Sequence, residues 1–208
     1  MKIHLLLTAT ALLGLVPHSL ANNLVANPGF EKLQASWSPF APEDDIKDWA
    51  IDDSEPHSGG AAAIIRSISP ARWALVSGLI GVYAGKKYQV EAWVRVSPNS
   101  TVAPGLPGFY VGATFMDSSW ESLSKNPPYN RIFFGLPNGI VDWESRKLLQ
   151  QEKLPEQWTK VSAVFEAPPE AKYMQVALTL HGFEGDIFLD DISVEKVDES
   201  TPLTESLR

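Results

Sequence analysis

GDIFLDDISVE, residues Gly185–Glu195, is an apolar strand that carries two adjacent carboxylates and then resumes as a strand. Two like charges on such a strand repel each other and cost desolvation energy unless a cation or hydrogen-bond donors compensate. Because strand side chains alternate between faces, Asp190 is expected inward with Ile192 and Val194, and Asp191 outward toward solvent. The stretch therefore predicts the closing strand of a β-structure with an inward-facing carboxylate.

NNLVANPGFE, residues Asn22–Glu31, is the natural counterpart of that strand at the other end of the chain. An inward carboxylate at Asp190 invites a hard cation, and Glu31 is a natural second oxygen ligand for one. The pair predicts a β-sandwich whose two termini meet around a metal. The alternative is that Glu31 and Asp190 cap backbone N–H groups without a metal.

Strand signals dominate the rest of the chain. The expected strands are short, β-branched or aromatic, and bounded by Gly, Pro, Asn or Ser; they are 61–66, 74–83, 87–96, 109–116, 159–167, 173–181 and 186–196. The best helix candidate is the short segment Trp143–Gln151. Many short antiparallel strands that each bury one face predict an all-β sandwich.

The segment Asp117–Gln157 interrupts the rhythm of the strands. About 40 residues between two strands exceed ordinary loop length, which indicates an insertion. It forms either a local core that covers a sheet edge or one wall of a ligand cleft. After Val197 the polar tail, residues 198–208, is expected to be disordered.

The first 21 residues have the pattern of a secretory signal peptide. Lys2 supplies the positive start, Leu5–Val16 the apolar run, and Ser19–Ala21 the small residues of a cleavage site. The alternative is an uncleaved anchor, although the run is too short to span a bilayer comfortably. We therefore expect a secreted or periplasmic protein whose mature part, residues 22–197, forms a single domain.

Charge and cysteine content narrow the function classes. Without Lys2 the chain has 25 acidic residues and a charge of about −9, which disfavours nucleic acid or an anionic membrane as partner. There is no cysteine, so the exported domain must be held by its core, with or without a metal. We expect a monomer.

Several segments resemble the carbohydrate-binding modules of families 4, 9 and 22, which are attached to bacterial cellulases and xylanases. The matching residues are Asn27–Glu31, Trp49, Ser58-Gly59, Ala84–Arg95, Trp158–Pro168 and Leu189–Val194. The likeness spans nearly all of residues 22–197 except the insertion. It is more specific for the fold than for the ligand.

The resemblance implies a galactose-binding-like jelly roll of two antiparallel sheets with one structural calcium ion. Glu31 and Asp190 match the positions of the side-chain ligands, and backbone carbonyls near Ser58 and Gly59 would complete the shell. Trp73 matches the position at which xylan-binding relatives place a stacking tryptophan.

Alternation along the strands gives a set of outward residues with the chemistry of a sugar site. A pyranose ring stacks its C–H face on an aromatic ring, while Gln, Arg or His hydrogen-bonds its hydroxyl groups. The candidate ligand-binding residues are Trp73, Trp93, Arg95, Tyr110, Gln175 and His181. The alternative is that these side chains are framework residues, with Trp93 covered by the insertion.

The sequence signals for catalysis or for a second metal site are weaker than those for sugar binding. The acidic run Glu43–Glu55, followed by His57, is typical of a solvated loop, although paired carboxylates could also cleave glycosides or hold a second calcium. No GxSxG elbow or P-loop is present. The sequence predicts a secreted, non-catalytic protein that binds a poly- or oligosaccharide. The alternatives are a protein-binding adhesion module and a lyase or hydrolase.

Overall fold

The structure is a computed structural model of the chain. It describes residues 23–40, 48–69, 73–104, 106, 108–123, 131–134, 141–142, 147–148 and 154–204. Only the backbone is described at 131–134, 141–142 and 147–148. The expected signal peptide, residues 1–21, lies outside these ranges, as does the first part of the acidic run, residues 43–47.

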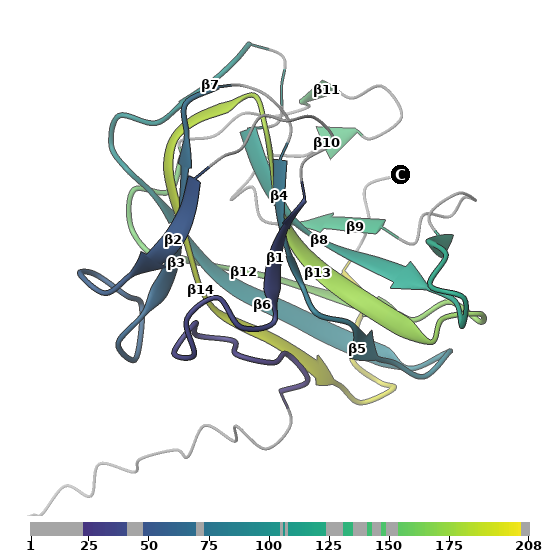
Figure 1. Cartoon of the computed structure of the whole chain (residues 1–208). Coiled ribbons are helices and arrows are strands. Elements are labelled where there is room, and N and C mark those ends of the chain that lie inside the picture. Colours follow the sequence, from purple (N-terminus) through teal and green to yellow (C-terminus); the bar gives the residue numbers. More distant parts are fainter. Residues whose placement is uncertain are drawn as a thin grey trace, which may run out of the picture.

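Two six-stranded antiparallel sheets pack face to face (Figure 1). Sheet A has the strand order β1 (Trp37–Phe40), β4 (Trp73–Ser77), β13 (Tyr173–His181), β8 (Gly108–Met116) and β9 (Arg131–Phe134), with β5 (Ile80–Gly81) paired to β13. Sheet B has the order β12 (Thr159–Glu166), β6 (Lys87–Val96), β14 (Phe183–Lys196), β3 (Ala62–Ser67) and β2 (Asp48–Asp52), with β7 (Thr101–Val102) paired to β14. The predicted all-β, two-sheet sandwich is confirmed.

The expected strands form with small shifts at their ends. The predicted strand at 74–83 is broken into β4 and β5 at Gly78 and Leu79. The helix expected at 143–151 is wrong where the chain is described, because β11 (Lys147–Leu148) pairs with β10 (Val141–Asp142) as a hairpin. A nine-residue helix has little stability of its own, and strand pairing replaces it.

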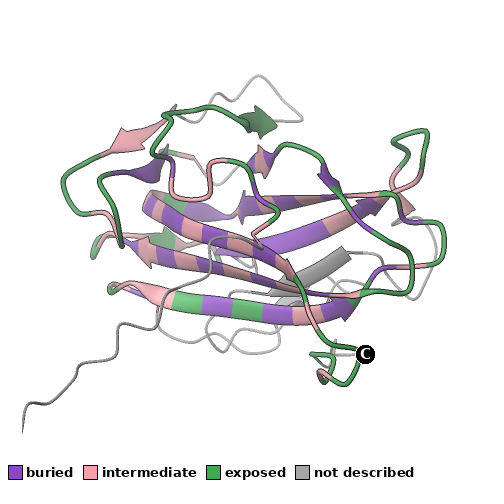
Figure 2. Cartoon of the chain, turned by 90° about the horizontal axis from the view of Figure 1, so that it is seen from below, coloured by how far each residue is buried: buried purple, intermediate pink, exposed green. Residues whose placement is uncertain are grey.

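The core lies between the sheets, and it follows the predicted alternation. In Figure 2 buried and partly exposed residues alternate along the long strands. The inward residues of β6, β8 and β13 are all buried; they are Tyr88, Val90, Ala92, Val94, Val96, Phe109, Val111, Ala113, Phe115, Met174, Val176, Leu178 and Leu180. Edge-to-face ring pairs join the sheets, with centroids 5.4 Å apart for Phe115 and Phe165.

A β-bulge lies in β14 between Asp190 and Ser193, where the register against β6 shifts by one residue. Asp191 has a positive φ of 45° at this point. The extra residue reverses the alternation, so Asp190 does not share the inward face of Ile192 and Val194. That expectation is wrong, because counting by twos across a bulge exchanges the two faces of the sheet.

Both ends of the described domain are tied to sheet B. Near the N-terminus, Leu24 N donates to Val194 O at 2.8 Å, and the Asn23 amide bonds to the backbone of Ile192 and Val194. The tail expected to be disordered is held over its described part, because Thr204 bonds to Val164 of β12. The Lys87 ammonium adds bonds to two carbonyls of the same tail.

Candidate functional site

A pocket of about 300 Å³ lies on the outer face of sheet A. Its lining residues come from β1, β4, β8, β13 and the start of the insertion; they are Phe40, Trp73, Ala74, Val76, Tyr110, Gly112, Ala113, Thr114, Met116, Ser122, Gln175, Ala177 and Thr179. The volume is at the lower end of the range for small-molecule sites. We call this feature the sheet A cleft.

The cleft exists because the middle of this face carries small side chains. In the register of the sheet, Ala177 of β13 lies between Val76 of β4 and Gly112 of β8. The neighbouring row runs from Phe40 through Ala74 and Thr179 to Tyr110. Its two aromatic residues are three strands apart, about 14 Å. Larger side chains therefore border a shallow floor of small ones.

Three of the sequence-predicted ligand residues, Trp73, Tyr110 and Gln175, are among the residues that line this cleft. Tyr110 is only 3% exposed, so it forms a wall rather than an open stacking surface. The Gln175 amide donates to Ser77 O at 2.9 Å, which fixes its orientation toward β4. His181 lies further along β13, in register with Gly108, and is not among the lining residues.

Trp73 is placed differently from its predicted stacking role. It is 1% exposed and belongs to the core cluster. Alternation puts it on the inward side with Leu75, whereas Ala74 and Val76 face the cleft. Its ring therefore offers no open stacking face to a ligand. Trp73 is nevertheless among the residues that line the cleft, although its side chain is buried.

Trp93 and Arg95 lie on β6, which belongs to sheet B, so they are on the opposite side of the sandwich from the cleft. The structure thus divides the predicted ligand set between two sheets. Trp93 is half-buried, and the loop that contains His57 lies against it. The imidazole stacks on the indole with ring centroids 3.8 Å apart and planes 18° apart.

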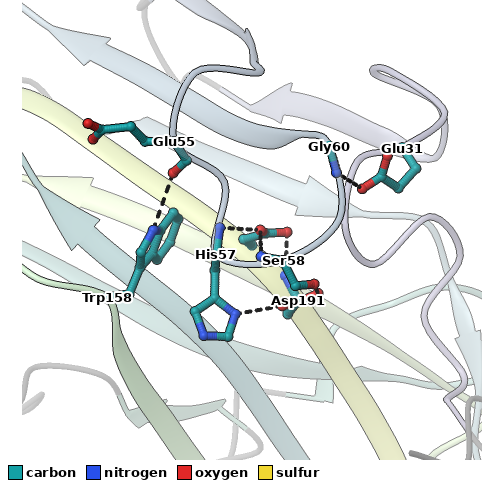
Figure 3. A network of polar contacts seen from close by, with 8 residues as sticks. Glu31, Glu55, His57, Ser58, Gly60, Trp158 and Asp191 are labelled. Atoms are coloured by element: carbon teal, nitrogen blue, oxygen red, sulfur yellow. Dashed lines mark hydrogen bonds and ion pairs between the residues drawn. The ribbon is translucent and has the colours of Figure 1, made fainter.

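Arg95 lies among aromatic rings on the same outer face of sheet B. Its guanidinium carbon is 4.3 Å from the ring centroid of Phe188 and 5.4 Å from that of Trp158, which is cation–π geometry. It also pairs with the carboxylate of Glu55. The indole of Trp158 donates to the Glu55 carbonyl at 3.3 Å (Figure 3). Together these contacts fasten the described end of the acidic run to sheet B.

Asp190 is fully buried beneath this loop. Its Oδ2 accepts hydrogen bonds from the backbone N–H groups of His57 at 2.9 Å and Ser58 at 3.2 Å, and its Oδ1 accepts one from Asp191 N at 2.7 Å. Next to it, Asp191 pairs with His57 Nδ1 at 2.6 Å and accepts a bond from the Ser58 hydroxyl (Figure 3). Glu31 accepts the Gly60 N–H at 2.8 Å.

Burial raises the pKa of Asp190 to about 6, and the negative charge of Asp191 adds to the effect, while the three backbone hydrogen bonds oppose it. The ionised form of Asp190 is therefore disfavoured even though three hydrogen-bond donors contact it. These three backbone N–H groups cap the Asp190 carboxylate. Such capping is the alternative to a metal ion that the sequence leaves open. Ser58 contributes its N–H and hydroxyl to this arrangement.

The donor set has the chemistry for calcium, although it does not form a ready-made cage. A Cβ added to Gly29 would be 3.5 Å from both Asp190 Oδ1 and Asp191 Oδ1 and 4.0 Å from Glu31 Cγ. The missing side chain leaves a cradle beside hard oxygen atoms, which Ca²⁺ prefers. Among the described residues, no group of three His, Cys, Asp or Glu side chains is placed to hold a metal ion. Backbone oxygens or water would have to complete a shell.

Phe40 and Ser122 are two of the cleft residues that lie outside the predicted ligand set. Phe40 is 61% exposed at the border of the cleft. It follows Pro39 in β1, which is the edge strand of sheet A, where a proline is tolerated. Ser122 lies within the insertion, which also supplies β9 to the edge of the sheet beside β8. The described parts of the insertion thus extend sheet A by one strand and contribute one residue to the lining of the cleft.

Comparison with known proteins shows similarity in fold. No protein-family model matches the chain, and no curated protein matches it in sequence. The enzymatically active domain of bacteriophage CBA120 tailspike protein 4 matches with a TM-score of 0.61 and 11% identity, over 84% of this chain and 21% of that one. The CBM22-1–GH10 modules of a Clostridium thermocellum xylanase, complexed with xylohexaose, match with a TM-score of 0.54 and 15% identity, over 88% of this chain and 30% of that one.

A family 16 carbohydrate-binding module is matched over its whole length, with a TM-score of 0.51, 13% identity and 84% of this chain covered. The chain thus spans a fifth to a third of the two larger structures, but the full length of a single module. Within the described residues, no helix is long and apolar enough to cross a membrane. By the structural match to the single module, the chain has the β-sandwich fold of the carbohydrate-binding modules that its sequence resembles.

Proposed function

We propose that the chain is a non-catalytic protein that binds a poly- or oligosaccharide in the sheet A cleft. The observation that carries the proposal is the row of four residues from Phe40 through Ala74 and Thr179 to Tyr110. It combines an exposed aromatic ring, a floor without bulky side chains and a hydroxyl group. This combination suits a pyranose ring, which is flat and apolar on its faces and polar at its rim.

The expected mechanism is stacking with hydrogen bonding on a preformed face. Phe40 supplies the exposed ring, and Gln175, Thr114 and Thr179 supply amide and hydroxyl groups to the sugar rim. Gln175 is already oriented by its bond to Ser77, so binding costs little side-chain entropy there. None of the described lining residues carries a charge. A neutral glycan is therefore the ligand that we expect, and the described lining offers no carboxylate pair for acid–base chemistry.

Calcium and secretion complete the proposal. We infer that one Ca²⁺ binds beside Glu31 and Asp190, as the family resemblance implies, and serves structure only. Its charge would offset the repulsion between the carboxylates of Asp190 and Asp191.

We also infer export, because the first 21 residues have the pattern of a signal peptide. A sugar-binding protein without cysteines is compatible with either a secreted or a periplasmic location.

The test is retention of the folded mature protein on immobilised xylan, glucan, mannan, galactan and acidic glycans. We expect retention on at least one neutral glycan and release by the soluble form of that glycan. New reducing ends or unsaturated products in the same assays would instead establish an enzyme. If folded protein is retained on no glycan but captures a protein ligand, the adhesion alternative replaces the proposal.

A further inference from the structure

The end of sheet A next to the insertion carries a second group of residues suited to a ligand. Tyr173 precedes Gln175 by two residues on β13, so the two side chains are on the same face of the sheet. Tyr173 is in register with Gly81 of β5 and with Met116 of β8. A Cβ added to Gly81 would meet nothing within 4 Å. The outer face therefore continues past the cleft as a half-buried tyrosine with an open position beside it.

The turn that follows β8 presents a tryptophan at this end of the cleft. Met116 and Ser122 both line the cleft, and an isolated bridge pairs them, so residues 117–121 form a closed turn between two lining residues. Trp120 lies in this turn and is 67% exposed. A large aromatic residue that stays exposed at the border of a concave site is more typical of a binding surface than of a core.

The turn holds Trp120 in a defined position. Asp117 Oδ1 accepts the N–H groups of Ser119 at 2.8 Å and Glu121 at 3.0 Å, and Asp117 O accepts the Trp120 N–H at 3.2 Å. Trp120 itself has a φ of 63°, a conformation that is uncommon for a bulky residue and that costs conformational energy. The turn therefore fixes the backbone that carries the exposed ring, which reduces the backbone part of the ordering cost of stacking a ligand on it.

We propose that Trp120 and Tyr173 form an outer subsite that stacks a further sugar ring of a glycan chain already held in the sheet A cleft. This inference rests on the proposed function and specifies its ligand as a chain rather than a single sugar. From Thr179 to Tyr173 the outer face of β13 extends about 20 Å, which exceeds the length of one pyranose ring. The occupant is a neutral oligosaccharide that enters the subsite by continuity with the cleft.

The test is calorimetric titration with xylo-, cello- and β-1,4-galacto-oligosaccharides of increasing length. For the series that binds, Trp120→Ala should weaken the affinity for the longest oligomer about tenfold and leave the affinity for the shortest binding oligomer unchanged. Trp120→Phe should restore most of the loss because it keeps a ring. Ile68→Ala is the matched control, since Ile68 is 90% exposed and precedes β4 outside the cleft lining, and it should bind all lengths normally.

Two outcomes separate this inference from the proposed function. If the wild type is retained on no immobilised glycan and binds none of these oligosaccharides, the proposed function fails and the subsite fails with it. If the wild type binds but Trp120→Ala has the wild-type affinity at every length, only the outer subsite is overturned.

Discussion

Asp190 of β14 lies directly opposite Trp93 of β6 in the register of sheet B. Directly paired residues share one face of a sheet, so the buried carboxylate and the indole both belong to the outer face. Asp190 is buried because the His57–Ser58 segment covers it, and His57 stacks on Trp93 at the same place. The carboxylates of β14 thus anchor a loop on sheet B, while the cleft lies on sheet A.

The loop anchor predicts unequal effects of the two neighbouring aspartates. Asp190→Ala should lower the free energy of unfolding by roughly 2–4 kcal/mol, because it leaves three backbone N–H groups without their acceptor. Asp191→Ala should cost about 1 kcal/mol or less, since its partners are partly exposed and its removal relieves repulsion with Asp190. Urea unfolding in chelator measures both. Equal losses would contradict the anchor.

Arg95 provides a test of which face binds the ligand. Arg95→Ala removes the Glu55 pair and two cation–π contacts, so we expect a loss of about 1–2 kcal/mol in stability. Its affinity for a retained glycan should stay within about twofold of the wild type, because β6 does not contribute to the cleft. Denaturant unfolding and calorimetry check the two quantities separately. A large loss of affinity in folded Arg95→Ala would return the binding site to sheet B.

Trp73 is expected to behave as a core residue. Trp73→Ala should destabilise the fold by about 3–5 kcal/mol, because it removes a fully buried side chain. Trp73→Phe keeps most of the apolar volume, and it should fold and bind glycan like the wild type. Thermal unfolding and affinity measurements on the two variants decide the matter. Folded Trp73→Phe with wild-type stability and no glycan binding would restore the stacking role.

Calcium is tested by thermal unfolding with and without chelator. We expect Ca²⁺ to raise the melting temperature by several degrees, because a bound cation stabilises the folded state by mass action. Glu31→Gln should abolish most of the difference while still folding, since a neutral amide is a weaker ligand. Mg²⁺ serves as the control ion. A melting temperature that does not change between chelator and excess Ca²⁺ would remove the metal.

Most of the fold could be predicted because strand alternation is a local signal. The alternating residues of β6, β8 and β13 identify the core face without knowledge of the partner strands. Sheet membership is not local. Trp93 and Tyr110 have the same outward pattern, yet β6 and β8 lie in different sheets, so the sequence could not show that their side chains are on opposite sides of the sandwich.

Two further parts of the site lacked a sequence signal. The bulge in β14 depends on pairing with β6 and is invisible in the alternation, so Asp190 was assigned to the wrong face. Phe40 lies in a four-residue edge strand that contains Pro39, where neither length nor pattern predicts a strand. The resemblance associated Glu31 and Asp190 with the segment around Ser58 and Gly59, and in the structure both carboxylates accept backbone N–H groups of residues 57–60.

The measurement that tests the central claim most directly is calorimetric titration of Phe40→Ala with the glycan that retains the wild type. We predict that its affinity falls about tenfold or more while its melting temperature stays near that of the wild type, because Phe40 is largely exposed. Ile68→Ala should match the wild type in both quantities. Wild-type affinity in Phe40→Ala, measured on folded protein, would contradict a carbohydrate site in the sheet A cleft.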